Sequence, residues 1–171
     1  MSEGITVTGS PTIEELEKTP GFPNKERLLK GPVAVIECVQ EISCDACGSV
    51  CPFDAIELAS MSSLPKLYEE RCTGCGSCIP LCPGLAIFLV DYNFSKDEAL
   101  VSFPYEFLPI PKVGTTVNAT DRLVMSVAKG RIVNVLEREI FDHTLVVSVA
   151  VPKEFAQIVR GIALPRGGRI P

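Results

Sequence analysis

The sequence predicts an α+β fold made of two unlike parts, and three observations lead to this prediction. All eight cysteines fall between residues 38 and 82. The segment that holds them is an internal repeat, in which one shift places Cys44 on Cys75 and Cys51 on Cys82. After residue 90 the cysteines stop, and short β-like runs separated by turn residues follow one another. We therefore expect an N-terminal arm over residues 1–32, a small cysteine-rich α+β domain over residues 33–90, and a mainly β part with a C-terminal tail over residues 91–171.

Composition narrows the classes of function. The net charge is −5 with no basic block and no tryptophan, so nothing predicts nucleic-acid binding. No run of about twenty apolar residues predicts a membrane span, and the first residues lack the pattern of a signal peptide, so we expect a cytoplasmic protein. The hydrophobic fraction of 46% fits either a well-filled core or apolar patches that partners cover.

The N-terminal arm contains one clear helix signal. Thr12 and Glu15 have the spacing of a capping box, which predicts a short helix that ends near Lys18. The proline-rich stretch Thr19–Pro23 then stops it. An arm of this kind has little capacity to form its own core, so we expect it to lie across a neighbour.

The internal repeat predicts two similar units. In each unit a strand enters a cysteine loop, a helical turn carries the last cysteine, and a second strand returns. The entering strands are predicted at Val33–Val39 and Pro65–Glu70, and the returning strands at Ile56–Leu58 and Ile87–Val90. Two such units form a small domain with pseudo-twofold symmetry.

The second cysteine motif predicts a [4Fe–4S] cluster. Its four cysteines follow the spacing C-x2-C-x2-C-x3-C-P in full: Cys72, Cys75, Cys78 and Cys82-Pro83. Gly74 and Gly76 lie between ligands, where the backbone must approach the cluster and positive φ angles are expected. Structural zinc uses two knuckles with a longer spacer, and a disulfide framework is typical of short secreted chains, so neither alternative is favoured.

The first motif departs from this spacing. Cys44, Cys47 and Cys51 keep the second, third and fourth positions, but Cys38 lies six residues before Cys44 instead of three. Cys38 is then either the first ligand at the end of a bulged loop or a buried strand cysteine that packs as a small hydrophobe. The first alternative gives two complete clusters and is favoured, whereas the second would leave a three-cysteine site suited to a [3Fe–4S] cluster.

Residues 33–90 resemble two-cluster [4Fe–4S] ferredoxins of the bacterial type. The resemblance implies crossed ligation, in which each cluster takes three cysteines from one motif and one from the other. The implied first set is Cys38, Cys44, Cys47 and Cys82; the implied second set is Cys72, Cys75, Cys78 and Cys51. The whole chain also resembles, more loosely, the dicluster iron–sulfur subunits of FAD-dependent dehydrogenase complexes.

Asp45 predicts a difference between the two clusters. It lies between Cys44 and Cys47 of the first motif. A carboxylate beside an anionic cluster disfavours the addition of an electron, which would lower the potential of the first cluster. A fully solvated Asp45 would contribute little.

The β part is predicted from five short runs: Ala99–Phe103, Thr115–Asn118, Leu123–Ala128, Ile132–Leu136 and Thr144–Val151. Turns are expected at the prolines 104, 109 and 111, at Lys129-Gly130 and at Asp142-His143. A short helix is expected over Pro152–Arg160, followed by an extended tail over Leu164–Pro171. These elements would make a sandwich or a partial barrel.

No catalytic constellation accompanies the cysteines. The sequence has no dinucleotide-binding glycine motif, and His143 lies in a predicted turn without an evident acid or base partner. We therefore expect a non-catalytic electron-transfer subunit of a multi-subunit oxidoreductase, a hetero-oligomer whose partners are FAD-containing flavoproteins. The alternatives are a free ferredoxin with an accessory domain and, less favoured, a structural or oxygen-sensing iron–sulfur protein.

Overall fold

The structure is a computed structural model and describes residues 4–164. Its helices are all short, and more of its residues lie in β-strands than in helices. The helices are α1 (Ile5–Thr8), α2 (Ile13–Leu16), α3 (Lys25–Leu28), α4 (Ala46–Val50) and the 3₁₀ turns η1 (Glu139–Phe141) and η2 (Lys153–Phe155). The strands are β1 (Val33–Ile36), β2 (Ile56–Glu57), β3 (Lys66–Leu67), β4 (Ile87–Asp91), β5 (Glu98–Tyr105), β6 (Thr116–Thr120), β7 (Ser126–Leu136), β8 (Leu145–Pro152) and β9 (Gly161–Ile162).

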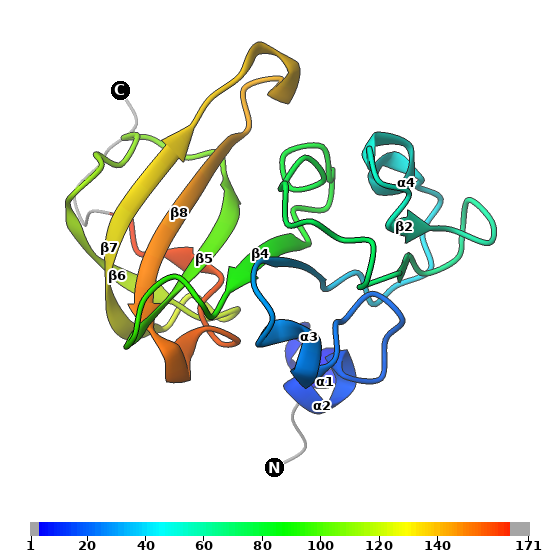
Figure 1. The fold of residues 1–171 in the computed structure, drawn as a ribbon, viewed down its shortest axis with the longest axis horizontal. Helices are drawn as coiled ribbons and strands as arrows, with labels where there is room; N and C mark the ends of the chain where they lie inside the picture. Colours follow the sequence, from blue (N-terminus) through cyan, green and yellow to red (C-terminus); the bar gives the residue numbers. More distant parts are fainter. Residues whose placement is uncertain (1–3, 165–171) are drawn as a thin grey trace.

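One antiparallel sheet connects the cysteine-rich segment to the rest of the molecule. Its seven strands have the order β1-β4-β5-β8-β7-β6-β9. Figure 1 shows this sheet on one side and the cysteine loops, with α4 and β2, on the other. The predicted boundary at residues 90 and 91 falls inside β4, which pairs with β1 on one edge and with β5 on the other. The two predicted parts therefore share one sheet.

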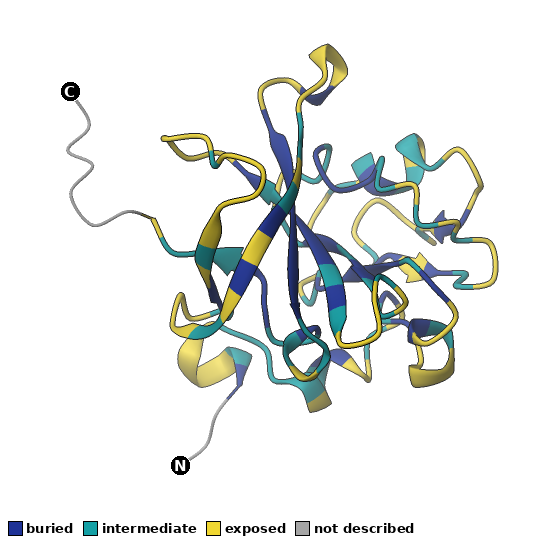
Figure 2. Cartoon of the chain, turned by 60° about the vertical axis from the view of Figure 1, so that its left-hand side comes forward, coloured by how far each residue is buried: buried dark blue, intermediate teal, exposed yellow. Residues whose placement is uncertain are grey.

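The sheet curls on itself. A cleft of about 1220 Å³ is lined by residues of β4 and β5 and also by residues of β6 and β9, which lie toward the opposite end of the strand order. Strands so far apart in the order can line one cleft only if the sheet bends around it. The central strand β8 is buried at every residue from Leu145 to Val151, and Figure 2 shows exposed residues concentrated in the loops around the buried strands.

The cysteine-rich segment shows the same contacts twice, at positions that the internal repeat makes equivalent. Ile36 pairs with Ile87 in the large sheet, and Leu67 pairs with Ile56 in the β2–β3 ribbon. The amide of Glu37 donates to the carbonyl of Ala86, and the amide of Tyr68 donates to that of Ala55, each at 2.8 Å. Asp54 and Leu85, which are also equivalent in the repeat, both have positive φ angles, of 48° and 51°. The two halves therefore share local backbone geometry.

The N-terminal arm packs against the cysteine-rich segment of its own chain. The predicted capping box at α2 is confirmed, because Thr12 accepts from the amide of Glu15 and Glu15 accepts from the amide of Thr12. The helix ends at Leu16, earlier than predicted, and Leu16 is fully buried. The carbonyls of Pro20 and Gly21 then accept from the amides of Leu67 and Ile36. These bonds fix the arm to both entering strands.

Three predicted features of the β part are wrong. Pro104, where a turn was expected, lies inside β5 and pairs with Val146 of β8. The turn expected at Lys129-Gly130 lies inside β7, which runs without a break through the two strands predicted on either side. The helix expected over Pro152–Arg160 is only the 3₁₀ turn η2. The tail predicted over Leu164–Pro171 lies outside the described residues except for Leu164. None of the helices between residues 4 and 164 combines the length and the apolar character that crossing a bilayer requires.

Candidate iron–sulfur sites

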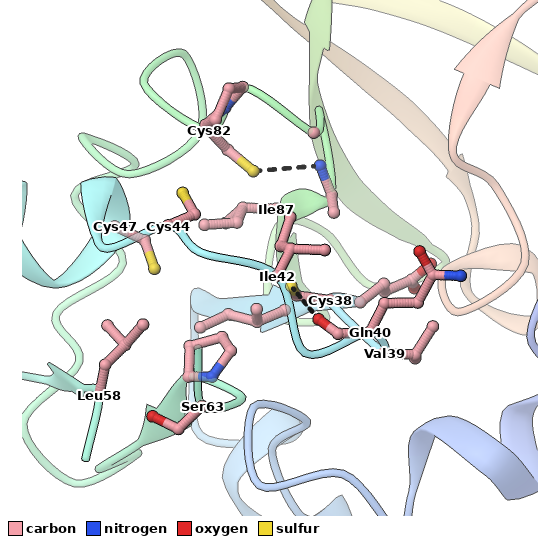
Figure 3. Close-up of a pocket in the computed structure, with 16 residues that line it drawn as sticks. Cys38, Val39, Gln40, Ile42, Cys44, Cys47, Leu58, Ser63, Cys82 and Ile87 are labelled. Atoms are coloured by element: carbon pink, nitrogen blue, oxygen red, sulfur yellow. Dashed lines mark hydrogen bonds between the residues drawn. The ribbon is translucent and has the colours of Figure 1, made fainter. Parts of the chain in front are cut away.

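Four cysteines from two separate motifs line the first cavity, which has a volume of about 180 Å³. They are Cys38, Cys44, Cys47 and Cys82. Figure 3 shows the sulfurs of Cys44, Cys47 and Cys82 gathered on one side of this cavity and Cys38 on another. Val39, Gln40 and Ile42, from the three-residue insertion and its neighbours, also line it. The longer loop after Cys38 therefore forms part of the cavity wall.

Three elements position these thiols. Strand β1 ends at Ile36 and delivers Cys38 two residues later. Cys44 precedes α4 and Cys47 lies in its first turn, where Cys47 is buried. Cys82 follows the second loop, and its sulfur accepts a hydrogen bond from the amide of Ala86 at 3.4 Å. Such amide donors stabilise charge on a ligand sulfur.

The other four cysteines line a second cavity: Cys51, Cys72, Cys75 and Cys78. The sulfur of Cys51 accepts from the amide of Ala55 at 3.3 Å, which repeats the bond between Ala86 and Cys82 in the first set. The sulfur of Cys72 accepts from the amide of Ala34 at 3.4 Å. Each cavity thus has three cysteines of one motif and the last cysteine of the other.

Within each set, neighbouring thiols raise one another's pKa values. Burial, followed by the charge of Cys82, raises the pKa of the Cys38 thiol, and the same causes raise the pKa of Cys47 to about 11. Burial raises the pKa of Cys78 to about 12, with further contributions from its set members, among them Cys72 and Cys75. These thiols are protonated at neutral pH, so binding a cluster through them releases protons.

The donor atoms fit an iron–sulfur cluster. Each cavity offers four thiols, which is the ligand set of a cubane cluster, and all eight cysteines are free of disulfides. Within residues 4–164 no three side chains of His, Cys, Asp or Glu converge on a point that could hold a single ion; the thiols are instead distributed around cavity walls. The second cavity has only about 20 Å³, space for roughly one water molecule. Its thiols must therefore spread apart to admit a cluster.

The two loop glycines have the predicted conformation. Gly74 and Gly76 have φ angles of 72° and 76°, which confirms the expectation of positive φ. A Cβ on Gly74 would lie 2.7 Å from the carbonyl oxygen of Pro32, whereas a Cβ on Gly76 would meet nothing closer than 3.6 Å. Gly74 therefore allows a close backbone approach that no other residue permits.

Two groups of charged residues near the cavities were not predicted from the sequence. Arg27 of α3 donates to the backbone carbonyls of Gly31, Pro32, Glu69 and Cys72, and so fixes the entry to the second cysteine loop. Near the first cavity, Glu37 binds two arginines, Arg122 and Arg160. The only available signal in the sequence was the position of Glu37, directly before Cys38. His143 is exposed in the turn after η1, away from both cavities.

The two cavities of four cysteines lie in an iron–sulfur cluster-binding segment of the chain. Residues 38–93, which contain all eight cysteines, match the family described as the LdpA iron–sulfur cluster-binding domain. The match begins at Cys38 and ends two residues after β4, so it contains the cysteines of both cavities and leaves most of the large sheet outside. No solved structure matches the chain significantly.

Curated proteins from several organisms match parts of the chain. A subunit of a Na⁺-translocating ferredoxin:NAD⁺ oxidoreductase complex from Acetobacterium woodii is 48% identical over 61 residues, which cover 30% of this chain and 18% of the relative. A subunit of an ion-translocating oxidoreductase complex from Methanosarcina acetivorans is 40% identical over 48 residues, covering 28% of this chain and 17% of the relative. An uncharacterized polyferredoxin-like protein from Methanocaldococcus jannaschii is 30% identical over 78 residues, covering 37% and 46%. The chain thus spans less than half the length of each of these relatives.

Proposed function

We propose that this chain binds two [4Fe–4S] clusters through crossed ligand sets and relays electrons as a subunit of a multi-subunit oxidoreductase. One observation carries the proposal: each of two cavities is lined by four cysteines, and each set draws on both motifs. When bound, the clusters supply one-electron redox chemistry, for which no other group is required. The ferredoxin-like dicluster domain, with its pseudo-twofold repeat, is part of the proposal and is supported by the contacts that recur at equivalent positions of the two halves.

The residues of the chain have distinct tasks in this function. The eight thiolates would hold the irons, and the amides of Ala34, Ala55 and Ala86 donate to three of the sulfurs. Crossed sets keep the two cavities adjacent, because Cys82 and Cys51 each follow the loop of the opposite set. No side chain in the described region is assigned a catalytic role, so the partner subunits would supply the reaction.

Assembly with partners is supported by apolar side chains outside the core. Phe107, Leu108, Ile110 and Val113 are exposed between β5 and β6, and Leu123, Val124 and Met125 are exposed between β6 and β7. Phe107, Val124 and Met125 line the same cleft, and contiguous exposed apolar surface marks interaction sites. Two of the relatives are named as subunits of oxidoreductase complexes, which supports a hetero-oligomer. We propose an FAD-containing flavoprotein as the partner that exchanges electrons with the chain.

The test is a pair of serine substitutions in the second motif. Anaerobically reconstituted wild-type protein should contain about eight irons and eight sulfides per chain, since two cubanes require them. Cys82→Ser should damage only the first cluster, whereas the matched variant Cys78→Ser should damage only the second. Iron and sulfide analysis measures how many clusters each variant holds, and EPR of the reduced proteins shows which cluster is damaged. If Cys82→Ser and Cys78→Ser destroyed the same cluster, the crossed sets would be wrong.

Association is tested separately. Purification of the native protein should yield a stoichiometric complex that contains bound FAD. A free monomer that reduces and oxidises several unrelated partners at equal rates would instead establish the alternative of a diffusible ferredoxin.

A further inference from the structure

A buried group of three charges lies beside the first cavity. Glu37 accepts from Nε of Arg122 at 2.7 Å and from its Nη2 at 2.5 Å, and it accepts from Nε of Arg160 at 2.7 Å. The exposed fractions of the three side chains are 6% for Glu37, 13% for Arg122 and 3% for Arg160. We call these residues the ion triad. Glu37 follows β1, whereas both arginines come from the β part, far later in the chain.

The ion triad carries an excess positive charge. It contains two guanidinium groups and one carboxylate, a net charge of +1, because both arginines stay protonated at neutral pH. Burial raises the pKa of Glu37, but the charges and hydrogen bonds of Arg160 and Arg122 outweigh burial, so its pKa lies below the usual value and the carboxylate is ionised. Within residues 4–164, neither arginine forms an ion pair with a second carboxylate, and Nη2 of Arg160 has no hydrogen-bond partner. The ion pairs of the described region therefore leave one positive charge of the triad without a paired carboxylate.

The ion triad is connected to two members of the first cysteine set. Glu37 lines the first cavity and directly precedes Cys38. Its amide donates to the carbonyl of Ala86, and the amide of Ala86 donates to the sulfur of Cys82. Because the triad is largely shielded from solvent, its field is screened less than that of a surface charge.

The second cavity has no matching group in the described part of the chain. The residue equivalent to Glu37 in the internal repeat is Tyr68, whose amide makes the equivalent bond to Ala55. Tyr68 is uncharged, and the cations stacked on its ring, Lys66 and Arg71, are exposed. Arg27 does approach the second set, at the carbonyl of Cys72. It shares a surface hollow with one further cation, Lys30, and with three carboxylates. These are Glu26, Glu69 and Glu70.

We propose that the ion triad stabilises the reduced first cluster and raises its midpoint potential relative to that of a site without the triad. The inference rests on the proposed function, because it requires that the first cysteine set holds a cluster. It also assigns a task to the β part, which supplies both arginines. Asp45, which had predicted a shift in the opposite direction, is exposed and makes no side-chain cap bond to α4. Solvent therefore screens its charge, and the buried triad has the larger effect.

The experiment compares the midpoint potentials of both clusters by EPR-monitored titration of the full chain. Arg122 is the least buried member of the triad, so Arg122→Gln removes one positive charge with the least disturbance. We expect the first midpoint to fall, corresponding to about a tenfold lower ratio of reduced to oxidised first cluster at a fixed potential. The second midpoint should not move. Arg122→Lys keeps the charge and should restore most of the wild-type value.

The matched control is Arg131→Gln, which also removes an ion-paired arginine from the β part. Arg131 pairs with Glu98 at 3.3 Å, and both side chains are well exposed, so neither midpoint should change. An unchanged first midpoint in fully loaded Arg122→Gln would overturn the inference, as would an equal shift of both clusters.

Iron analysis separates this inference from the proposed function. A wild-type chain that binds fewer than two clusters would contradict the proposed function itself. If Arg122→Gln does not load its first cluster, Arg122→Lys decides the inference. A first midpoint near that of the wild type in the loaded lysine variant would support it. A first midpoint shifted by an amount equivalent to the tenfold change in the ratio of reduced to oxidised cluster would contradict it.

Discussion

Glycine 74 shows how closely the second cysteine loop approaches the rest of the chain. Its φ angle of 72° is in the left-handed region, and Pro32 occupies the space that a side chain would need. Gly76, two residues later, has nearly the same φ angle but open surroundings. Substituting each glycine in turn therefore separates the energetic cost of a positive φ angle, which both positions share, from the cost of a steric clash, which only Gly74 has.

We expect Gly74→Ala to destabilise the second site more than Gly76→Ala. Both substitutions place an alanine at positive φ, which costs about 1 kcal/mol, but only Gly74→Ala also forces a Cβ against Pro32. The total cost at Gly74 should be about 2–4 kcal/mol. Loss of cluster absorbance in a urea titration measures the difference. Equal midpoints for the two variants would show that Pro32 moves away freely.

At the residue scale, the sequence was a good guide wherever chemistry depends on local spacing. The positive φ angles of Gly74 and Gly76 and the capping box of Thr12 and Glu15 were expected from residues within a few positions of one another. The ion triad does not depend on local spacing, because Glu37 meets Arg122 and Arg160 only through the folded sheet. No pattern of neighbouring residues could have predicted that contact.

Strand β7 shows why one element was misread. Lys129-Gly130 has the composition of a turn, yet Gly130 is buried in the strand and pairs with Val117. The glycine is needed for packing, since a Cβ there would lie 2.5 Å from Cγ1 of Val149 on the adjacent strand β8. A glycine that permits close approach between strands and a glycine that permits a turn look the same in a sequence.

We expect Gly130→Ala to lower the free energy of unfolding by about 1–3 kcal/mol, because the added methyl group overpacks the contact with Val149. Shortening the opposing side chain, with Val149→Ala, should relieve part of this cost in the double variant. Urea unfolding followed by circular dichroism, analysed as a double-mutant cycle, gives the coupling. Strictly additive costs would mean that the two residues do not meet.

At the scale of the whole molecule, the large sheet unites the cysteine-rich segment with the β part. Strand β4 belongs to both, since it pairs with β1 and with β5. The predicted division at residue 90 followed the end of the cysteines and the change of composition, which mark a change of chemistry. Such signals say nothing about pairing between distant strands, so the shared sheet could not be seen in the sequence. The division into domains stays a prediction.

A fragment of residues 1–97 should therefore bind its first cluster poorly. It retains all eight cysteines but lacks β5 through β9, so β4 loses its neighbour and Glu37 loses both arginines. We expect at most half of the iron content of the full-length chain after identical reconstitution, with the first cluster as the one depleted. Iron analysis measures the total iron content, and EPR shows which cluster is depleted. Two stable clusters in the fragment would show that the cysteine-rich segment folds independently of the sheet.

The crossed cysteine sets also constrain the order of events during synthesis of the chain. The ribosome makes Cys38 and Cys44 early, but the first set is complete only at Cys82, and the second set is complete at Cys78. Under the proposed ligation, neither cluster can be fully held until both cysteine motifs have been translated, and both sets then become complete within four residues of each other. The arginines that hold Glu37 emerge later still. During synthesis, both cysteine sets would thus become complete almost simultaneously. The buried charges beside the first set would form last.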